Sequence, residues 1–180
     1  MLMERQASNA DWLQANLGIN DKEKEKIRIA GLENLRMHAL IFCRWTQVMM
    51  RFEKAMYENP DQDLNMLWWD LVKEYQGITP PEGRNAPDWA AKIHLAQYPA
   101  YYHNYQLGEL AASQIQDHII KHVIKEQSSE YPTFANRKEV GDYLRSHIFA
   151  PGSSLRWNEL LKQVTGESLT AKFFADEYMK

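Results

Sequence analysis

The hydrophobic and polar positions along this chain repeat with helical spacing almost throughout. Between residues 21 and 58, most apolar residues follow one another at intervals of three, four, seven or eight positions, which places them on one side of a helix. The same spacing recurs over 61–76 and 100–126. No segment shows the convincing twofold alternation of apolar and polar residues that is typical of a half-buried strand. The pattern therefore predicts an all-α fold.

Residues that favour helix ends divide the pattern into segments. The pair Ser8-Asn9 is typical of a helix N-terminus and Gly18 of a C-terminus, while Asn136 and Ser154 predict two further N-termini. The prolines and glycines of 77–90 exclude a regular helix there. We expect one helical subdomain over 1–180, with helices at about 1–17, 21–58, 61–76, 100–126, 136–149, 154–165 and 170–179, a loop at 77–99, and at most a short extended segment near 91–95.

Composition and charge narrow the class of protein. The 180 residues are 44% hydrophobic and 25% charged, with a formal net charge of −3, which is ordinary for a globular chain with a real core. This charge gives no electrostatic reason to expect nucleic acid or an anionic membrane as a partner. No apolar run approaches the roughly 20 residues of a membrane span, and the single cysteine, Cys43, excludes an internal disulfide. We therefore expect no nucleic-acid partner and no membrane span, and the localisation stays open.

The residues that suggest chemistry are concentrated between 91 and 105. Lys92 and His94 lie two positions apart, and an extended backbone would point both side chains to the same side. Tyr102 and Tyr105 lie three positions apart and share a helix face. Together they would offer an ammonium, an imidazole and two phenols to one ligand. The alternative is structural, namely a helix N-terminus whose aromatic rings belong to the core.

A second pair of residues has the spacing of metal ligands. His118 and His122 lie four positions apart on a predicted helix, as zinc-binding histidines often do. The residues between them lack the glutamate of the H-E-x-x-H zinc motif. Neither a general base nor a third ligand accompanies them. We therefore expect no metal site in this chain.

Several short motifs stand out against the general helical pattern. Residues 68–81 contain W-W-D-L followed by Y-Q-G-I-T-P-P, residues 91–94 read A-K-I-H, residues 102–105 read Y-H-N-Y, and residues 157–166 contain W-N-E-L-L and T-G. Together with residues 1–18, these motifs resemble the C-terminal part of the zinc peptidyl-dipeptidases of the angiotensin-converting-enzyme family. The resemblance extends over nearly the whole chain.

The resemblance implies a role for each residue of the polar cluster. Lys92 and Tyr102 would hold the C-terminal carboxylate of a peptide substrate, because an ammonium and a phenol suit an anionic end group. Tyr101 competes with Tyr102 for this role, although the spacing to Tyr105 favours Tyr102. His94 would hydrogen-bond a substrate backbone carbonyl. Tyr105 would donate its hydroxyl to the oxyanion of the tetrahedral intermediate.

The resemblance also implies what this chain lacks. In the family, the H-E-x-x-H helix and the glutamate that is the third zinc ligand both precede the position that corresponds to Met1. Zinc would then belong to a full-length parent and not to this chain, which alone should be inactive. The N-terminal part of the same protein would be its partner. The arginine that the family links to a chloride site falls at Asn104, which argues against chloride activation and leaves chloride dependence open.

Three interpretations of function follow. The chain is the substrate-pocket part of a zinc metallopeptidase that releases C-terminal dipeptides, with oligopeptidase action by the parent still open. Alternatively, it is a stand-alone helical module that binds peptide C-termini without catalysis. Saturable peptide binding that weakens on Lys92→Ala or on amidation of the peptide would then be expected, whereas a fragment whose pocket needs the missing half should show no such binding. In a third interpretation it is a foldable subdomain without its own activity, which self-associates through an exposed apolar face.

Overall fold

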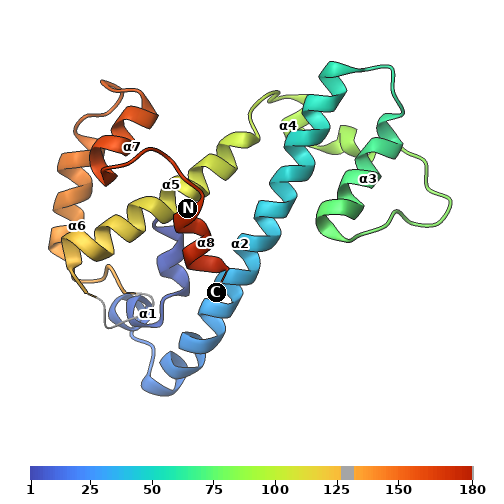
Figure 1. The fold of residues 1–180 in the computed structure, drawn as a ribbon. Coiled ribbons are helices and arrows are strands. Elements are labelled where there is room, and N and C mark those ends of the chain that lie inside the picture. The colour runs from blue at the N-terminus through green and yellow to red at the C-terminus, as the bar shows by residue number, and fades with distance from the viewer. Residues whose placement is uncertain (127–131, 180) are drawn as a thin grey trace. The chain divides into compact units, whose positions relative to one another are not determined.

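The computed structural model describes residues 1–126 and 132–179, and within these residues every regular element is helical, as the sequence predicts (Figure 1). The elements follow in the order η1 Glu4–Ser8, α1 Ala10–Leu17, α2 Asp21–Glu58, α3 Leu64–Gln76, η2 Asp88–Ala91, α4 Ile93–Ala96, α5 His103–His118, η3 Ile119–Ile124, α6 Lys138–Tyr143, η4 Leu144–Phe149, α7 Trp157–Thr165 and α8 Lys172–Tyr178. The described residues fall into two compact units, the first made of 1–37 and 108–180 and the second of 38–107. Helices α2 and α5 each contribute residues to both units.

The first unit begins with a helix pair whose ends follow local chemistry. The Asn9 side chain accepts a hydrogen bond from the backbone N–H of Trp12 at 2.8 Å, and Gly18 ends α1 in the left-handed conformation. Of the predicted pair Ser8-Asn9, Asn9 is the cap, and the predicted end at Gly18 is confirmed. Gly31 lies inside α2, where a Cβ would approach the backbone oxygen of Ser8 to 2.5 Å. Glycine at this position therefore allows close packing of the two segments.

A buried polar network ties the two ends of the first unit together. The Arg5 guanidinium, which is 2% exposed, donates to the carboxylates of Glu109 at 2.9 Å and Glu177 at 2.8 Å. It also donates to the hydroxyl of Ser113, which in turn donates to Glu177 at 2.7 Å. Gln116 donates to the other carboxylate oxygen of Glu177. The network fixes η1 and α8 to α5, because each hydrogen bond joins two of these elements.

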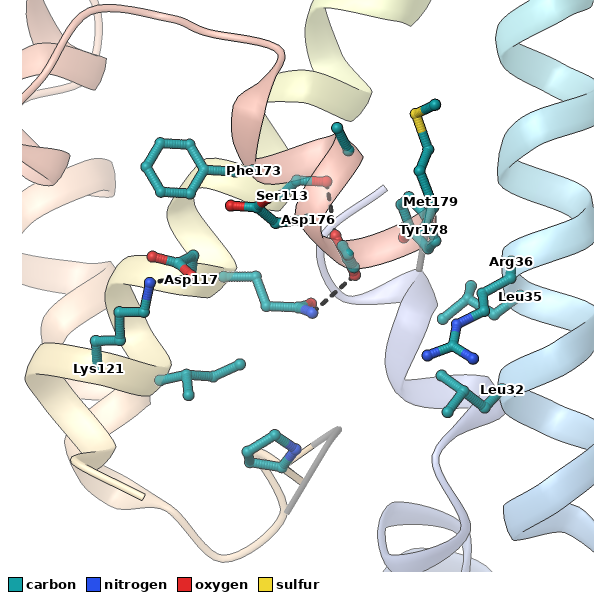
Figure 2. A pocket seen from close by; sticks show the side chains of 15 residues that line it. Leu32, Leu35, Arg36, Ser113, Asp117, Lys121, Phe173, Asp176, Tyr178 and Met179 are labelled. Carbon is teal, nitrogen blue, oxygen red and sulfur yellow. Dashed lines mark hydrogen bonds and ion pairs between the residues drawn. The ribbon is translucent and has the colours of Figure 1, made fainter. Parts of the chain in front are cut away.

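This network borders a cavity of about 510 Å³ in the first unit (Figure 2). Apolar side chains, including Leu32, Leu35 and Phe173, line part of it. Its polar lining is largely committed to internal contacts, since Ser113 bonds Glu177 and Asp117 forms an ion pair with Lys121 at 2.7 Å. We therefore assign these polar groups to the stability of the unit.

The second unit has an aromatic core built on α2 and α3. Asp63 caps the start of α3 by accepting from the N–H of Met66, and Gly77 ends it in the left-handed conformation. The buried residues of this core are Val48, Met49, Phe52, Trp68, Val72, Leu95 and Tyr102. Edge-to-face contacts join Trp68 to Phe52, with ring centroids 5.2 Å apart, and to Trp45, at 5.8 Å. This core is the platform on which the polar cluster is built.

Several local expectations differ from the structure. The segment near 91–95 is not a strand, because Lys92 alone has extended dihedral angles and Ile93–Ala96 form the single turn α4. Asn136 has a positive φ of 59° and precedes α6 without capping it. Helix α7 begins at Trp157, three residues after Ser154, and Glu159 accepts from the Arg156 N–H at its start. The N-cap residues of α6 and α7 are thus Arg137 and Arg156, and not Asn136 and Ser154.

Among the residues that the structure describes, no helix combines the length and the apolar character needed to cross a membrane.

Candidate functional site

The polar cluster predicted between 91 and 105 lies within the second unit, at the start of two helices. Lys92 is the N-cap of α4 and His94 lies in its only turn, while Tyr105 lies in the first turn of α5. Ala100 has a φ of 53°, which turns the chain between these helices. The buried carboxylate of Glu53 accepts the Ala100 N–H and holds this turn. Local backbone geometry therefore brings the two short segments together.

His94 and Tyr105 are in direct contact. The His94 Nε2 atom lies 3.0 Å from the Tyr105 hydroxyl, and the two rings meet edge to face at 5.4 Å between centroids. The Tyr102 ring lies 4.9 Å from both the His94 ring and the Tyr105 ring. Tyr102 and Tyr105, which were expected to share a helix face, are thus neighbours in space, and His94 contacts both rings. An imidazole and a phenol joined in this way can pass a proton or share a polar ligand.

Tyr102 is anchored in the core, whereas Tyr101 is not. The Trp45 indole N–H donates to the Tyr102 hydroxyl oxygen at 2.8 Å. Tyr102 is only 8% exposed, while Tyr101 is 49% exposed. The Tyr101 ring still reaches the Tyr105 ring, with centroids 5.8 Å apart. Both tyrosines therefore border the cluster, and Tyr102 is the one that the core holds in place.

The Lys92 ammonium lies among indole rings. Its Nζ atom is 5.4 Å from the centroid of the Trp45 ring and 5.8 Å from that of Trp68. Aromatic faces attract cations through their quadrupole and do not neutralise them. Asp88, which forms an ion pair with Arg84, also interacts electrostatically with Lys92, but among the described residues no carboxylate forms a direct ion pair with the Lys92 ammonium. The ammonium is thus placed where an anion could become its direct partner.

Burial controls the protonation of Tyr102. Loss of solvent raises the pKa of Tyr102 above its ordinary value of 10.0, and the hydrogen bond from Trp45 opposes this rise without cancelling it. The phenol therefore remains protonated at neutral pH. A protonated phenol can donate a hydrogen bond to an anionic ligand.

Two contributors to the site are not evident from the sequence motifs. Trp45 is remote in sequence and lies in the long helix α2, where its spacing marks it only as a core residue. Glu53, in the same helix, is a buried carboxylate within an apolar stripe. A carboxylate on the apolar side of a helix needs a hydrogen-bond partner, so the position of Glu53 in the sequence indicates that it binds another group. The sequence does not indicate which group this is.

The histidine pair at 118 and 122 forms part of an aromatic stack. The rings of His118 and His122 lie 4.6 Å apart, His118 stacks on Tyr143, and Tyr143 stacks on His147 at 4.6 Å. Burial first, and the nearby His122 second, lower the pKa of His118. Within 1–126 and 132–179, no group of three or more histidine, cysteine, aspartate or glutamate side chains is arranged to hold a metal ion. These residues do not fit a catalytic zinc site, and we derive no chemical step through zinc from this chain.

The described residues form an all-helical protein in which an ammonium, an imidazole and phenols lie together in one compact unit. The family model described as angiotensin-converting enzyme matches residues 4–179. Because this match covers nearly the whole chain, the chain belongs to the angiotensin-converting-enzyme family of peptidases. The predicted resemblance is thereby confirmed at the level of the family.

Individual relatives agree with this placement. The angiotensin-converting enzyme-like protein Ace3 of Mus musculus is 29% identical over 82% of this chain and 20% of its own length. Angiotensin-converting enzyme of Theromyzon tessulatum is also 29% identical, over 68% of this chain and 20% of its own. Carboxypeptidase 1 of Bacillus subtilis is 25% identical over 88% of this chain and 30% of its own. The chain thus spans about a fifth to a third of these relatives, and no solved structure gives a significant match.

Proposed function

We propose that this chain supplies part of the substrate pocket of a zinc peptidyl-dipeptidase, namely the part that recognises the C-terminal end of the peptide. The observation that supports the proposal most directly is the environment of Lys92, whose ammonium lies over two indole rings without a carboxylate in ion-pair distance among the described residues. An anion that enters this site would become the direct ion-pair partner of the ammonium. The buried phenol of Tyr102 would donate a second hydrogen bond to it.

The other members of the cluster have roles in the same proposal. His94 would hydrogen-bond a backbone carbonyl of the peptide. The Tyr105 hydroxyl lies within hydrogen-bond distance of His94, at 3.0 Å. It would donate a hydrogen bond to the oxyanion that forms at the cleaved peptide bond. Tyr101 would cover the outer side of the cluster, where it is half exposed. Zinc and the residues that bind it would come from a preceding part of a longer protein, and this chain alone would not hydrolyse peptides.

The nucleotide sequence upstream of the codon for Met1 tests this proposal first. We expect an open reading frame in the same phase that encodes H-E-x-x-H and, further on, a glutamate close to Met1. In a parallel assay, the purified 180-residue chain supplied with zinc should not cleave a blocked tripeptide. Zinc-dependent cleavage by the chain, abolished by Tyr105→Phe, would contradict the division of roles.

A second candidate function is supported by one observation. All five residues of the cluster, together with Trp45 and Trp68, belong to the same compact unit. A stand-alone module could therefore bind peptide C-termini without catalysis. Calorimetric titration separates the two candidates, since the module should bind an acetylated tripeptide with a free carboxylate saturably and its C-terminal amide poorly. If the chain shows no saturable binding, the result favours the first candidate, in which the chain is one part of a peptidase pocket.

A further inference from the structure

We infer that Trp45 is a positioning residue for carboxylate recognition, because its single N–H donates to the Tyr102 oxygen and so leaves the Tyr102 proton directed to the ligand. This inference deepens the proposed function and rests on it. It assigns to a residue of the long helix α2 a task that the motifs around 91–105 do not reveal.

The chemistry of the two groups fixes the direction of the hydrogen bond. An indole N–H can only donate, whereas a phenol can both donate and accept. The distance of 2.8 Å between Trp45 Nε1 and the Tyr102 hydroxyl oxygen therefore means that Tyr102 accepts. With one lone pair engaged by Trp45, the hydroxyl proton turns away from the indole. Among the residues that the structure describes, no acceptor takes this proton.

The ring of Tyr102 is held in the core, since the residue is 8% exposed. Its hydroxyl therefore has a fixed position, with its oxygen engaged by Trp45. A ligand carboxylate at this point would accept the hydroxyl proton. The energetic gain is then specific to ligands with an acceptor at this point, which is the behaviour expected of a recognition site.

Trp45 also contacts the second group that the carboxylate would need. Its ring face lies 5.4 Å from Lys92 Nζ, and the edge-to-face contact with the buried Trp68 fixes the plane of the indole. One rigid side chain thus orients a phenol through its N–H and an ammonium through its face. Phenylalanine at this position would keep an aromatic face near Lys92 but would lose the N–H.

The hydrogen bond itself is tested on the 180-residue chain by nuclear magnetic resonance of the indole N–H groups. The chain has six tryptophans. In Tyr102→Phe we expect one indole N–H signal, which Trp45→Phe identifies by its disappearance, to move upfield. Tyr105→Phe is the matched control, because it also removes one hydroxyl and keeps the ring. A Trp45 signal that does not move in Tyr102→Phe would overturn the inference and leave the proposed function untouched.

The positioning role is tested by a double-mutant cycle on the affinity for the acetylated tripeptide and for its amide. The measured quantity is the Kd of the chain or, where the chain alone does not bind, the KM of the longer zinc peptidase. Trp45→Phe should weaken recognition of the free acid about tenfold and leave the amide nearly unchanged. In the Tyr102→Phe background, the same substitution should have almost no further effect.

Additive losses in the cycle would show that Trp45 does not act through Tyr102, and would overturn the inference. Equal losses for acid and amide would show a general packing defect, with the same consequence. If both peptides are recognised equally by the wild-type protein, the proposed function fails, while the resonance experiment still decides whether the Trp45 bond exists. The two failures are therefore distinguishable.

Discussion

The two compact units place their shielded cations differently. In the first unit, the buried Arg5 guanidinium forms ion pairs with the carboxylates of Glu109 and Glu177. In the second unit, the half-buried Lys92 lies over indole rings without an ion pair to a described carboxylate, and the Tyr102 hydroxyl has no described acceptor for its proton. A cation shielded from water is normally paired, and one without a direct partner tends to occur at a functional site. We therefore attribute the first arrangement to folding and the second to ligand binding.

The largest effect should come from breaking the Arg5 network. Arg5→Met leaves the partly buried carboxylates of Glu109 and Glu177 without their countercharge, which should lower the free energy of unfolding by about 3 kcal/mol. Urea denaturation followed by circular dichroism measures this change. The control is Lys54→Met, which removes an exposed pair with Glu58 and should change stability by less than about 1 kcal/mol. Equal effects of the two substitutions would remove the distinction between the units.

Removal of the Tyr105 hydroxyl tests the functional side of the comparison. In the longer zinc peptidase that we propose, Tyr105→Phe should lower kcat by about 10²–10³-fold, because the proposed oxyanion donor would act mainly in the transition state. Its effect on the stability of this chain should be small, since the ring and its packing remain. Steady-state kinetics and denaturation of the same variant measure both quantities. A variant with normal kcat but reduced stability would place Tyr105 with the structural residues.

Neutralising Lys92 should give a smaller and more selective effect. Lys92→Gln removes the countercharge of the proposed carboxylate and should weaken recognition of a free-acid peptide about tenfold, with little change for the amide. Comparison of Kd or KM for the two peptides provides the measurement. The stability of the chain should fall by only about 0.5–1 kcal/mol, because the substitution removes the contacts of the ammonium with the Trp45 and Trp68 rings but no ion pair among the described residues. Loss of stability without loss of selectivity would argue for a structural lysine.

The smallest effect concerns pH and belongs to the first unit. Because the pKa of His118 in the folded chain lies below its ordinary value of 6.5, the unfolded chain takes up this proton more readily. The contribution of His118 to stability is therefore full above about pH 6.5 and is lost as the pH falls below it. Denaturation at several pH values between 8 and 5 should show this decline, and His118→Gln should reduce it. An unchanged slope in that variant would assign the decline to other groups.

The sequence predicts much of the fold because the signals involved are local. Asn9 and Gly18 define a helix through their own side-chain and backbone preferences, and the structure confirms both. Asn136 has similar preferences, but the chain uses it for a left-handed turn before α6. A residue that favours both caps and turns does not by itself determine which one forms. This ambiguity explains why the sequence predicts a helix near 136–149 correctly but not the residue at which it begins.

The candidate site likewise contains residues that the sequence identifies and residues that only the structure identifies. The motif around Lys92, His94 and the tyrosines is contiguous, so a resemblance to known peptidases can find it. Trp45 and Glu53 are some fifty residues away in sequence, and only the packing of α2 brings them to Tyr102 and to the turn at Ala100. Helical periodicity identifies such residues as buried, but it does not name their partners.

The sequence by itself determined the all-α class, the main helices and the residue types gathered between 91 and 105, because these depend on short-range periodicity and on contiguous motifs. The tertiary structure decided which polar groups are satisfied. Arg5 meets Glu177 across 172 residues, while Tyr102 meets Trp45 across 57. Hydrogen-bond partners of this kind depend on how segments distant in sequence pack against one another. The spacing of residue types along the chain does not determine that packing.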